Sequence, residues 1–356
     1  MNRIAILTLA ALAFAGAAGA AAPSVPSFKD PLDLAAPATA LGARMQLAAV
    51  TRAGNRLVAV GIRGLVIYSD DEGKHWSQAR VPVSEELVAV QFVTPEIGWA
   101  VGHGGVVLHS EDGGKTWVKQ LDGRIAAKLL KAHFSAKAAA GDSRARAYLN
   151  GVDLNYQDGP EQALLGVWFE DERNGFVAGS FGTLLSTHDG GKTWESWMER
   201  VDSDDLLHLN AVRGIGGNIY LASEHGTVFR LDRNKQRFVP TSTGYGGSFF
   251  GLVGQGNTVV AYGLQGTAYR TADAGATWQR IDTGVRSTID GGTVLSDGRI
   301  ALVTQDGQIL ISADDGRHFR PVAVRSRSLF QDIVQVGASS VVVVVGSDGL
   351  QLAGLE

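Results

Sequence analysis

Ser110-Glu-Asp112-Gly-Gly114-Lys-Thr116-Trp117 is the stretch that the chain repeats most closely. Two near copies and two weaker ones follow the same pattern, and they lie at Ser69–Trp76, Thr187–Trp194, Thr271–Trp278 and Ser312–Phe319. The closing aromatic residues are 41, 77, 84 and 41 positions apart. The step of 84 predicts a worn copy near residue 236, and the step of 77 predicts an insertion of roughly 36 residues. A period near 40 with four short strands per unit is typical of a β-propeller.

The box of eight residues has a physical interpretation as a folding device. The Asp112 carboxylate can accept backbone N–H groups of its own hairpin turn, and the glycines supply positive φ. Trp117 can pack against a sheet face at the contact between blades. We therefore expect structural roles for the aspartates and tryptophans of all the boxes, namely Asp71, Asp112, Asp189, Asp273, Asp314, Trp76, Trp117, Trp194 and Trp278.

The second unit shows how a box fits into one blade. Leu87–Phe92 reads as the innermost strand, residues 98–101 as the second and residues 106–110 as the third, and Trp117 opens the outer strand. Equivalent innermost strands begin near residues 47, 87, 164, 208, 249, 289 and 329, which predicts an all-β, seven-bladed propeller over residues 45–356. The last unit has material for only three strands. We expect the extended arm of residues 23–44 to supply the missing outer strand near residues 27–35 and to close the ring.

The box resembles the Asp-box, or bacterial neuraminidase repeat, of sialidases, sortilin-type receptors and some endoglucanases. The longer pattern Gly-Trp-Ala-Val-Gly at residues 98–102, followed by its box, is more similar to the photosystem II stability and assembly factor family. This resemblance covers about residues 45–356 and implies a seven-bladed propeller without enzymatic activity. It also implies an exported binding scaffold or assembly factor for a membrane or envelope complex, with transporters of the resistance-nodulation-division type as frequent companions of bacterial relatives.

Residues 1–22 have the character of a secretory signal peptide. Arg3 precedes a short apolar run, and small residues end at Ala20 or Ala22. The mature chain is then periplasmic or secreted. It has no cysteine, so it forms no disulfide and carries no lipid-modified cysteine. A formal charge of −4 argues against nucleic acid as a partner.

Residues 121–163 form the insertion between the second and third blades. An Ala-rich segment, Arg124–Ala140, predicts a helix with an apolar stripe, and Arg144–Leu149 predicts a second short helix. The stripe consists of Ile125, Leu129, Ala132, Ala136 and Ala140, widened by Leu130 and Phe134. Residues 124–146 are rich in Lys and Arg. This composition fits a solvated helix packed on the propeller, a surface that docks a partner, or a contact with anionic lipid.

Enzymatic function is the alternative that the Asp-box raises. A sialidase needs an Arg cluster and a starting Phe/Tyr-Arg-Ile-Pro segment, which this chain lacks, and other glycosidases need two carboxylates. Only Asp290 and Asp332 are acidic on the innermost strands, and solvation in the channel explains both. The eight histidines show no metal-ligand spacing. We therefore expect no catalytic residue, metal or cofactor. A glycan-binding or sialidase-like propeller and a purely structural homo-oligomeric module remain alternatives.

The turns between second and third strands define the face on which we expect a partner. Links from one blade to the next lie on that same face, so the insertion should rise there, and the boxes lie on the opposite face. The turn residues differ in chemistry between blades, whereas the flanking glycines repeat. The candidate partner-binding residues are Arg63, His103, Phe181, His225, Gln265, Asp306 and Asp348 from the turns, and Arg124, Lys128, Lys131 and Lys137 from the insertion.

Overall fold

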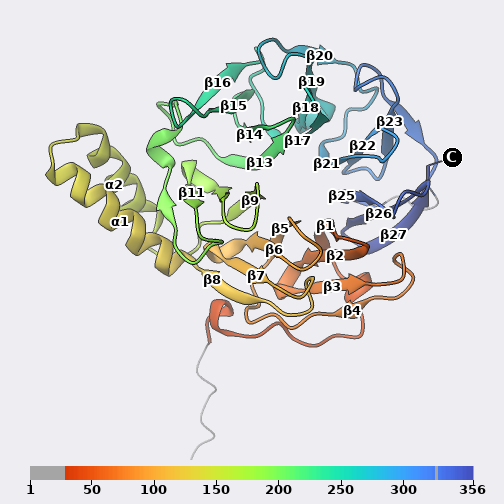
Figure 1. Ribbon diagram of the computed structural model, residues 1–356, viewed down its shortest axis with the longest axis horizontal. Helices are drawn as coiled ribbons and strands as arrows, with labels where there is room; N and C mark the ends of the chain where they lie inside the picture. The colour runs from red at the N-terminus through yellow and green to blue at the C-terminus, as the bar shows by residue number, and fades with distance from the viewer. Residues whose placement is uncertain (1–28, 325–327, 356) are drawn as a thin grey trace, which may run out of the picture.

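The computed structural model describes residues 29–324 and 328–355, so the predicted signal peptide lies outside the described residues. Seven antiparallel sheets form a ring of blades around a central axis, and a pair of helices projects from the side of the ring (Figure 1). The prediction of a seven-bladed propeller with a helical insertion between blades 2 and 3 is confirmed. Innermost strands begin within one residue of the predicted positions in all seven blades.

Each blade runs from an inner strand at the axis to an outer strand at the rim, and blade 7 has three strands. The strands are β1 Leu47–Ala53, β2 Arg56–Gly61, β3 Val66–Ser69 and β4 Ser77–Gln78 in blade 1; β5 Leu87–Phe92, β6 Gly98–Gly102, β7 Val107–Ser110 and β8 Val118–Leu121 in blade 2; β9 Leu164–Phe169, β10 Gly175–Gly179, β11 Leu184–Thr187 and β12 Glu195–Ser196 in blade 3; β13 Leu209–Ile215, β14 Asn218–Ser223, β15 Thr227–Asp232 and β16 Arg237–Ser242 in blade 4; β17 Phe249–Gln255, β18 Thr258–Gly263, β19 Ala268–Thr271 and β20 Gln279–Ile281 in blade 5; β21 Ile289–Val294, β22 Ile300–Thr304, β23 Ile309–Ser312 and β24 Arg320–Val322 in blade 6; β25 Phe330–Gln335, β26 Val341–Gly346 and β27 Gly349–Gly354 in blade 7.

The hydrophobic core consists of layers between neighbouring blades. Second strands such as β6 and β10 are buried along their whole length, because each lies between two other strands and two other blades. The buried apolar residues fall into seven clusters, one for each contact between adjacent blades around the ring. Trp117 lies in the layer between blades 1 and 2, as the sequence predicts for a box aromatic.

The boxes form tightly hydrogen-bonded turns between third and fourth strands. Asp112 Oδ1 accepts the backbone N–H groups of Lys115 and Thr116 at 3.0 and 2.9 Å, and its Oδ2 accepts the Thr116 hydroxyl at 2.6 Å. Ser110 Oγ donates to Asp112 Oδ1 and accepts the N–H of Gly114. The worn copy in blade 4 keeps less of this network: Asp232 accepts two backbone N–H groups at 3.1 Å, and no Ser or Thr supports it.

The N-terminal arm does not close the last blade, and the expectation for residues 27–35 is wrong over its described part. The short helical turn η1 (Pro31–Asp33) packs on blades 1 and 2, where Leu32 is buried. Asp30 caps this turn and Pro31 begins it, which disfavours a strand there. The ring closes instead through the apolar layer between blades 7 and 1 and through the turn η2 (Gly42–Arg44), which lies against β27.

The insertion is a hairpin of two helices, α1 (Gly123–Ala139) and α2 (Ser143–Asn155). Asp122 and Asp142 cap the two N-termini. The second helix is longer than predicted. The predicted stripe is confirmed at Leu130 and Phe134, which form the buried face of α1 together with Ala126. Its other members are shifted off this face: Ile125, Ala132, Ala136 and Ala140 are exposed, and Leu129 is partly buried. The shift arises because α2 and blade 3 cover one side of α1 together.

Candidate binding surface

The turns between second and third strands share one left-handed geometry at the tip in blades 1 to 5. Arg63, Phe181, His225 and Gln265 have φ values of 52° to 56°, in the left-handed region where glycine is easier. In blade 2 that position belongs to Gly104, not to the predicted His103, which precedes it and is exposed. Asp306 and Asp348 are exposed at the corresponding turns of blades 6 and 7. We call the face that carries these turns the insertion-bearing face.

The insertion leaves this face but does not rise above it. It starts at the end of β8, beside the turn η4 (His103–Gly105), and then runs along the outside of blade 3, where α1 contacts β12. Figure 1 shows both helices at the side of the ring rather than over its centre. The expectation that the insertion rises over the face is therefore correct for its two ends and wrong for the hairpin itself.

Most of the candidate basic residues of the insertion are engaged within the protein. Arg124 forms a two-pronged ion pair with Asp33, with both N–O distances at 2.7 Å, and the pKa of Asp33 falls to about 2 because Arg124 donates to it. Lys131 pairs with Asp153 at 2.8 Å. Lys137 pairs with Glu199 at 2.6 Å. Lys128 is exposed and has no ion pair among the described residues. The insertion is thus less basic toward a partner than its sequence predicts.

Glu199 fixes the hairpin to the propeller, and sequence reasoning missed it. It lies in the turn η6 (Met198–Arg200) after β12, and its Oε1 contacts His133 Nε2 and Lys137 Nζ, both at 2.6 Å. Burial would raise the pKa of this carboxyl, but the bonds from Lys137 and His133 lower it overall. Ser196 also donates to its Oε2, but the two partners on the hairpin lie more than 60 residues earlier in the chain, so no local pattern marks this role of Glu199.

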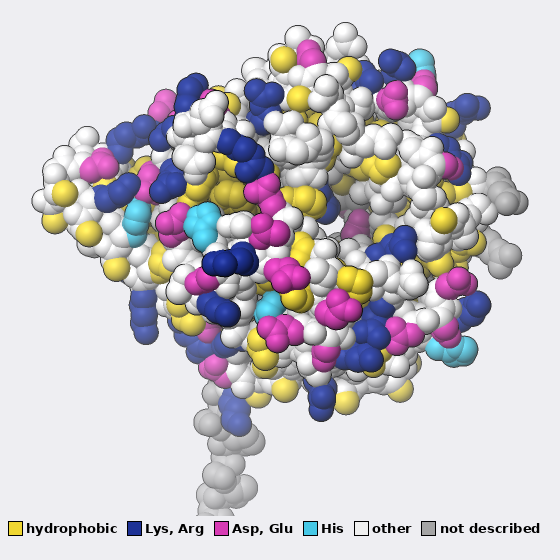
Figure 2. All heavy atoms as spheres, in the orientation of Figure 1, with side chains coloured by type: hydrophobic (Ala, Val, Ile, Leu, Met, Phe, Trp, Pro, Cys, Tyr) yellow, Lys and Arg dark blue, Asp and Glu magenta, His cyan; other side chains and the backbone are white. Residues whose placement is uncertain are grey.

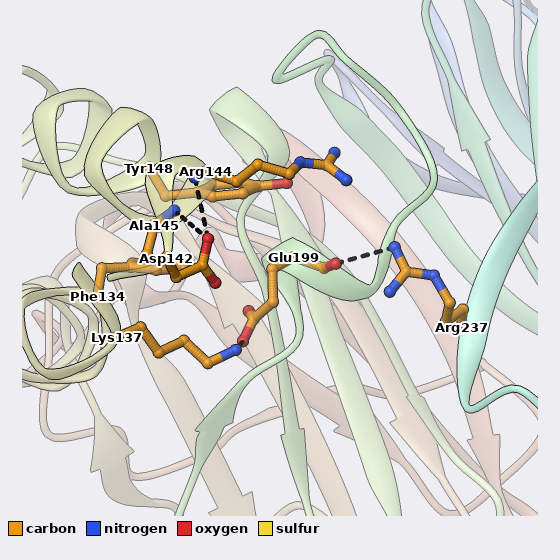
Figure 3. Close-up of a pocket in the computed structure, with 8 residues that line it drawn as sticks. All are labelled: Phe134, Lys137, Asp142, Arg144, Ala145, Tyr148, Glu199 and Arg237. Atoms are coloured by element: carbon orange, nitrogen blue, oxygen red, sulfur yellow. Dashed lines mark hydrogen bonds and ion pairs between the residues drawn. The ribbon is translucent and has the colours of Figure 1, made fainter. Parts of the chain in front are cut away.

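A groove separates the hairpin from the rim of blades 3 and 4 (Figure 3). A cavity of about 200 Å³ lies between α1, the start of α2 and the η6 turn, and Lys137 and Glu199 meet inside it. The Arg144 side chain extends beside the Tyr148 ring, toward a second cavity of about 260 Å³. That cavity lies between α2 and the link that follows η6, which Asp204 and Leu206 line.

The segments that depart from the repeat converge on the insertion-bearing face. A cavity of about 530 Å³ is lined by Asp30 and Pro31 of the arm, by Glu85 and His103 of blade 2, and by the exit of the insertion at residues 158–161. The link before β13 reaches the same face, where His208 lies 4.7 Å from the Phe181 ring centre to centre. The Phe181 side chain is 40% exposed.

The axial channel opens on this face through a ring of seven bulged residues. In every blade the pairing of the inner strand with the second strand skips one residue, directly after the first residue of the inner strand. A bulged residue is unpaired, and its side chain is re-aimed. The seven skipped residues, which we call the bulge ring, all line the channel cavity; they are Ala48, Val88, Leu165, Asn210, Phe250, Asp290 and Gln331.

The two channel carboxylates differ in their surroundings. Asp332 Oδ2 accepts the N–H of Val50 in blade 1 at 3.0 Å, and its Oδ1 accepts the N–H of Ile333 at 2.8 Å, so this residue connects blades 7 and 1. Asp290 accepts one hydrogen bond, from Gln305 at 3.3 Å. Burial raises the pKa of each carboxyl to about 6. Both Asp332 oxygens bind backbone amides, whereas Asp290 receives a single bond, so the two carboxylates are not equivalent.

Two further findings concern metal binding and membrane-spanning helices. Over residues 29–324 and 328–355, no group of three or more His, Cys, Asp or Glu residues is placed to hold a metal ion. No helix in the same ranges is long and apolar enough to cross a membrane.

The protein is a seven-bladed propeller built from neuraminidase-type repeats. The profile of the family "Photosynthesis system II assembly factor YCF48" matches residues 42–138 and 147–340, so the chain belongs to this family. The gap in this match spans the tip of the helical hairpin.

Solved structures agree with this fold. "YCF48 bound to D1 peptide" superposes with a TM-score of 0.64 at 15% identity, over 94% of this chain and 100% of the other. YCF48 from Cyanidioschyzon merolae gives 0.60 at 18% identity, over 89% and 97%. The WD40 β-propeller domain of Doa1 gives 0.62 at 10% identity, over 92% and 97%. No curated protein sequence matches the chain significantly. At these identities the structural matches establish the fold alone.

Proposed function

We propose that this protein is an exported, non-catalytic binding scaffold that holds a polypeptide segment of an envelope or membrane complex on its insertion-bearing face. The observation that carries the proposal is the convergence on that face of three described segments that depart from the repeat. The arm, the exit of the insertion and the link before β13 all meet there, next to the mouth of the channel.

Several features support a polypeptide rather than a small molecule as the ligand. The face offers a cavity formed between separate segments, exposed apolar side chains such as Phe181 and Leu264, and turn residues that differ from blade to blade. A small-molecule site is commonly a single enclosed apolar pocket. A related propeller of the same family carries a bound D1 peptide, which supports a protein partner here.

The finer parts of the proposal rest on the sequence. The apolar N-terminal stretch of residues 1–22 supports export to the periplasm or beyond. The photosystem-assembly resemblance supports a role in assembling a membrane complex, and a transporter of the resistance-nodulation-division type is our first candidate partner. A peripheral lipid contact through residues 124–146 is a weaker proposal, because Arg124, Lys131 and Lys137 form ion pairs within the protein.

The test compares two faces of the same folded protein. Deleting residues 124–146 is a poor test, because it would remove buried residues of the layer between blades 2 and 3. Phe181→Asn and Arg63→Asn are better, since asparagine tolerates the left-handed backbone at both turns. The matched control is Lys115→Glu with Lys192→Glu on the box face, where both lysines are exposed.

Each variant would be crosslinked in intact envelopes, purified by affinity, and analysed by mass spectrometry. We expect the turn variants to lose the partner that the wild type and the box-face control retain. Loss of that partner from the control alone would refute the proposed face.

A further inference from the structure

The geometry points to the bulge ring as a binding site for one lysine side chain of a polypeptide partner, with the aliphatic stem on the apolar half of the ring and the ammonium group at Asp290 and Gln331. The inference rests on the proposed function only in taking the ligand to be part of a polypeptide. It names the chemistry of the anchor, which neither the fold nor the family match specifies.

The ring is divided into two unlike halves. Blades 1, 2 and 3 contribute Ala48, Val88 and Leu165, which form a continuous apolar arc. Blades 6 and 7 contribute the acceptors Asp290 and Gln331 on the opposite side. Phe250 and Asn210 complete the ring in blades 5 and 4. A ligand centred in this ring therefore meets hydrocarbon on one side and hydrogen-bond acceptors on the other.

Two acceptors on the polar side lack a strong donor. Gln331 Oε1 is buried and receives no hydrogen bond from any residue that the structure describes. Asp290 has no ion pair among the described residues and receives only the 3.3 Å bond from Gln305. A buried acceptor without a donor is costly, so a ligand that brings donors gains the corresponding free energy. Figure 2 shows a hollow at the axis of the ring, with an acidic side chain visible inside it.

The channel cavity is also lined by Asp332, Arg213 and Tyr262. Asp332 binds two backbone amides. The Arg213 guanidinium lies farther along the channel, and its charge acts on Asp332 and on Tyr262. The Tyr262 hydroxyl lies close to Gly251, where a β-carbon would be only 2.3 Å away, so it borders the ring from blade 5. Asp290 is thus the carboxylate that remains for an incoming cation.

Lysine fits this opening better than the other biological cations. The channel cavity has a volume of about 110 Å³, which suits a slender chain more than a planar guanidinium. An ammonium group is a compact charge with three donors on a flexible four-carbon stem. Its stem can remain on an apolar surface while its head reaches polar groups.

The experiment titrates the full folded protein with capped pentapeptides that differ only at the central residue. Lysine is compared with norleucine, which keeps the stem and lacks the charge, and with arginine and glutamine. Binding would be followed by chemical-shift changes of the channel residues at millimolar peptide. We expect the lysine peptide to bind about tenfold more tightly than the norleucine peptide, the size of one charge-assisted hydrogen bond.

Three variants separate the ring from the rest of the face. Asp290→Asn should abolish the preference for lysine, Gln331→Leu should reduce it, and Asp348→Asn, an exposed acidic residue on the same face, should leave it unchanged. Equal binding of lysine and norleucine, stronger binding of arginine, absence of binding by any peptide, or an undiminished preference in Asp290→Asn would each overturn the inference. These outcomes are independent of the face comparison above, because no natural partner is used.

Discussion

Replacement of Asp112 by alanine tests the structural interpretation of the boxes. Burial would raise the pKa of Asp112, but the bonds from Thr116, Ser110 and Lys115 outweigh it and lower the pKa overall. The substitution removes four hydrogen bonds, of which those to the N–H and hydroxyl of Thr116 and to Ser110 lie in a half-buried turn. Water can replace the bond to the exposed Lys115 amide. At roughly 1 kcal/mol for a net hydrogen bond, with partial replacement by water, we expect a loss of about 2 kcal/mol.

The assay is urea denaturation of Asp112→Ala beside Asp232→Ala, the equivalent residue of the worn box. Asp232 accepts only two backbone N–H groups in an exposed turn, so its replacement should cost about 0.5 kcal/mol or less. The Asp112 variant should therefore unfold at distinctly lower urea, while it still binds the partner when folded. Equal stability of the two variants, or loss of partner binding with an unchanged urea midpoint, would refute the reasoning.

Two further predictions concern titratable side chains. The pKa values of Asp290 and Asp332 are about 6 in the folded protein against 3.8 in the unfolded chain, so the native state binds more protons between these values and stability should fall as pH rises from about 4 to 6. In urea midpoints measured against pH, Asp290→Asn should make this decline shallower and leave the part that Asp332 contributes. The pKa of Glu199 is lowered in the folded state, so its contribution to stability is present above the unfolded pKa and is lost as pH falls through the folded pKa. Glu199→Gln should therefore speed amide hydrogen exchange in α1 at neutral pH, while the strands β6 and β10 keep their protection.

The repeat could be predicted from the sequence because its signals are local. In the Ser110–Trp117 copy, the Ser110 hydroxyl and the Trp117 indole bond to groups within the same eight residues. The starts of the inner strands follow from the period, and the helices of the insertion follow from composition. These features do not depend on which distant segment comes to lie beside them.

The remaining features depend on contacts between distant segments. The arm packs on blade 2 because Leu32 fits the layer between blades 1 and 2 and because Lys119 and Arg124 hold Asp33. The buried stripe of α1 is set by α2 and by blade 3. Glu199 binds side chains more than 60 residues away. A linear pattern specifies none of these partners.

The bulge ring could be predicted from the sequence in part. The sequence already identified the inner strands and the two channel carboxylates, but not the single residue per blade that leaves the ladder. Alignment of the seven units on the first apolar residue of each inner strand places Asp290, Gln331, Leu165 and Val88 at the same position. The bulge itself, which turns these side chains toward the axis, becomes visible only in the strand register.

The most direct test of the account is site-specific photo-crosslinking in living cells. A photoreactive amino acid would replace Phe181 or Gln265 on the insertion-bearing face, and Lys115 or Lys192 on the box face; all four side chains are exposed. The account predicts that Phe181 and Gln265 give an adduct with one and the same envelope protein, and that Lys115 and Lys192 do not. An adduct with that protein from the box face, and none from Phe181 or Gln265, would contradict it.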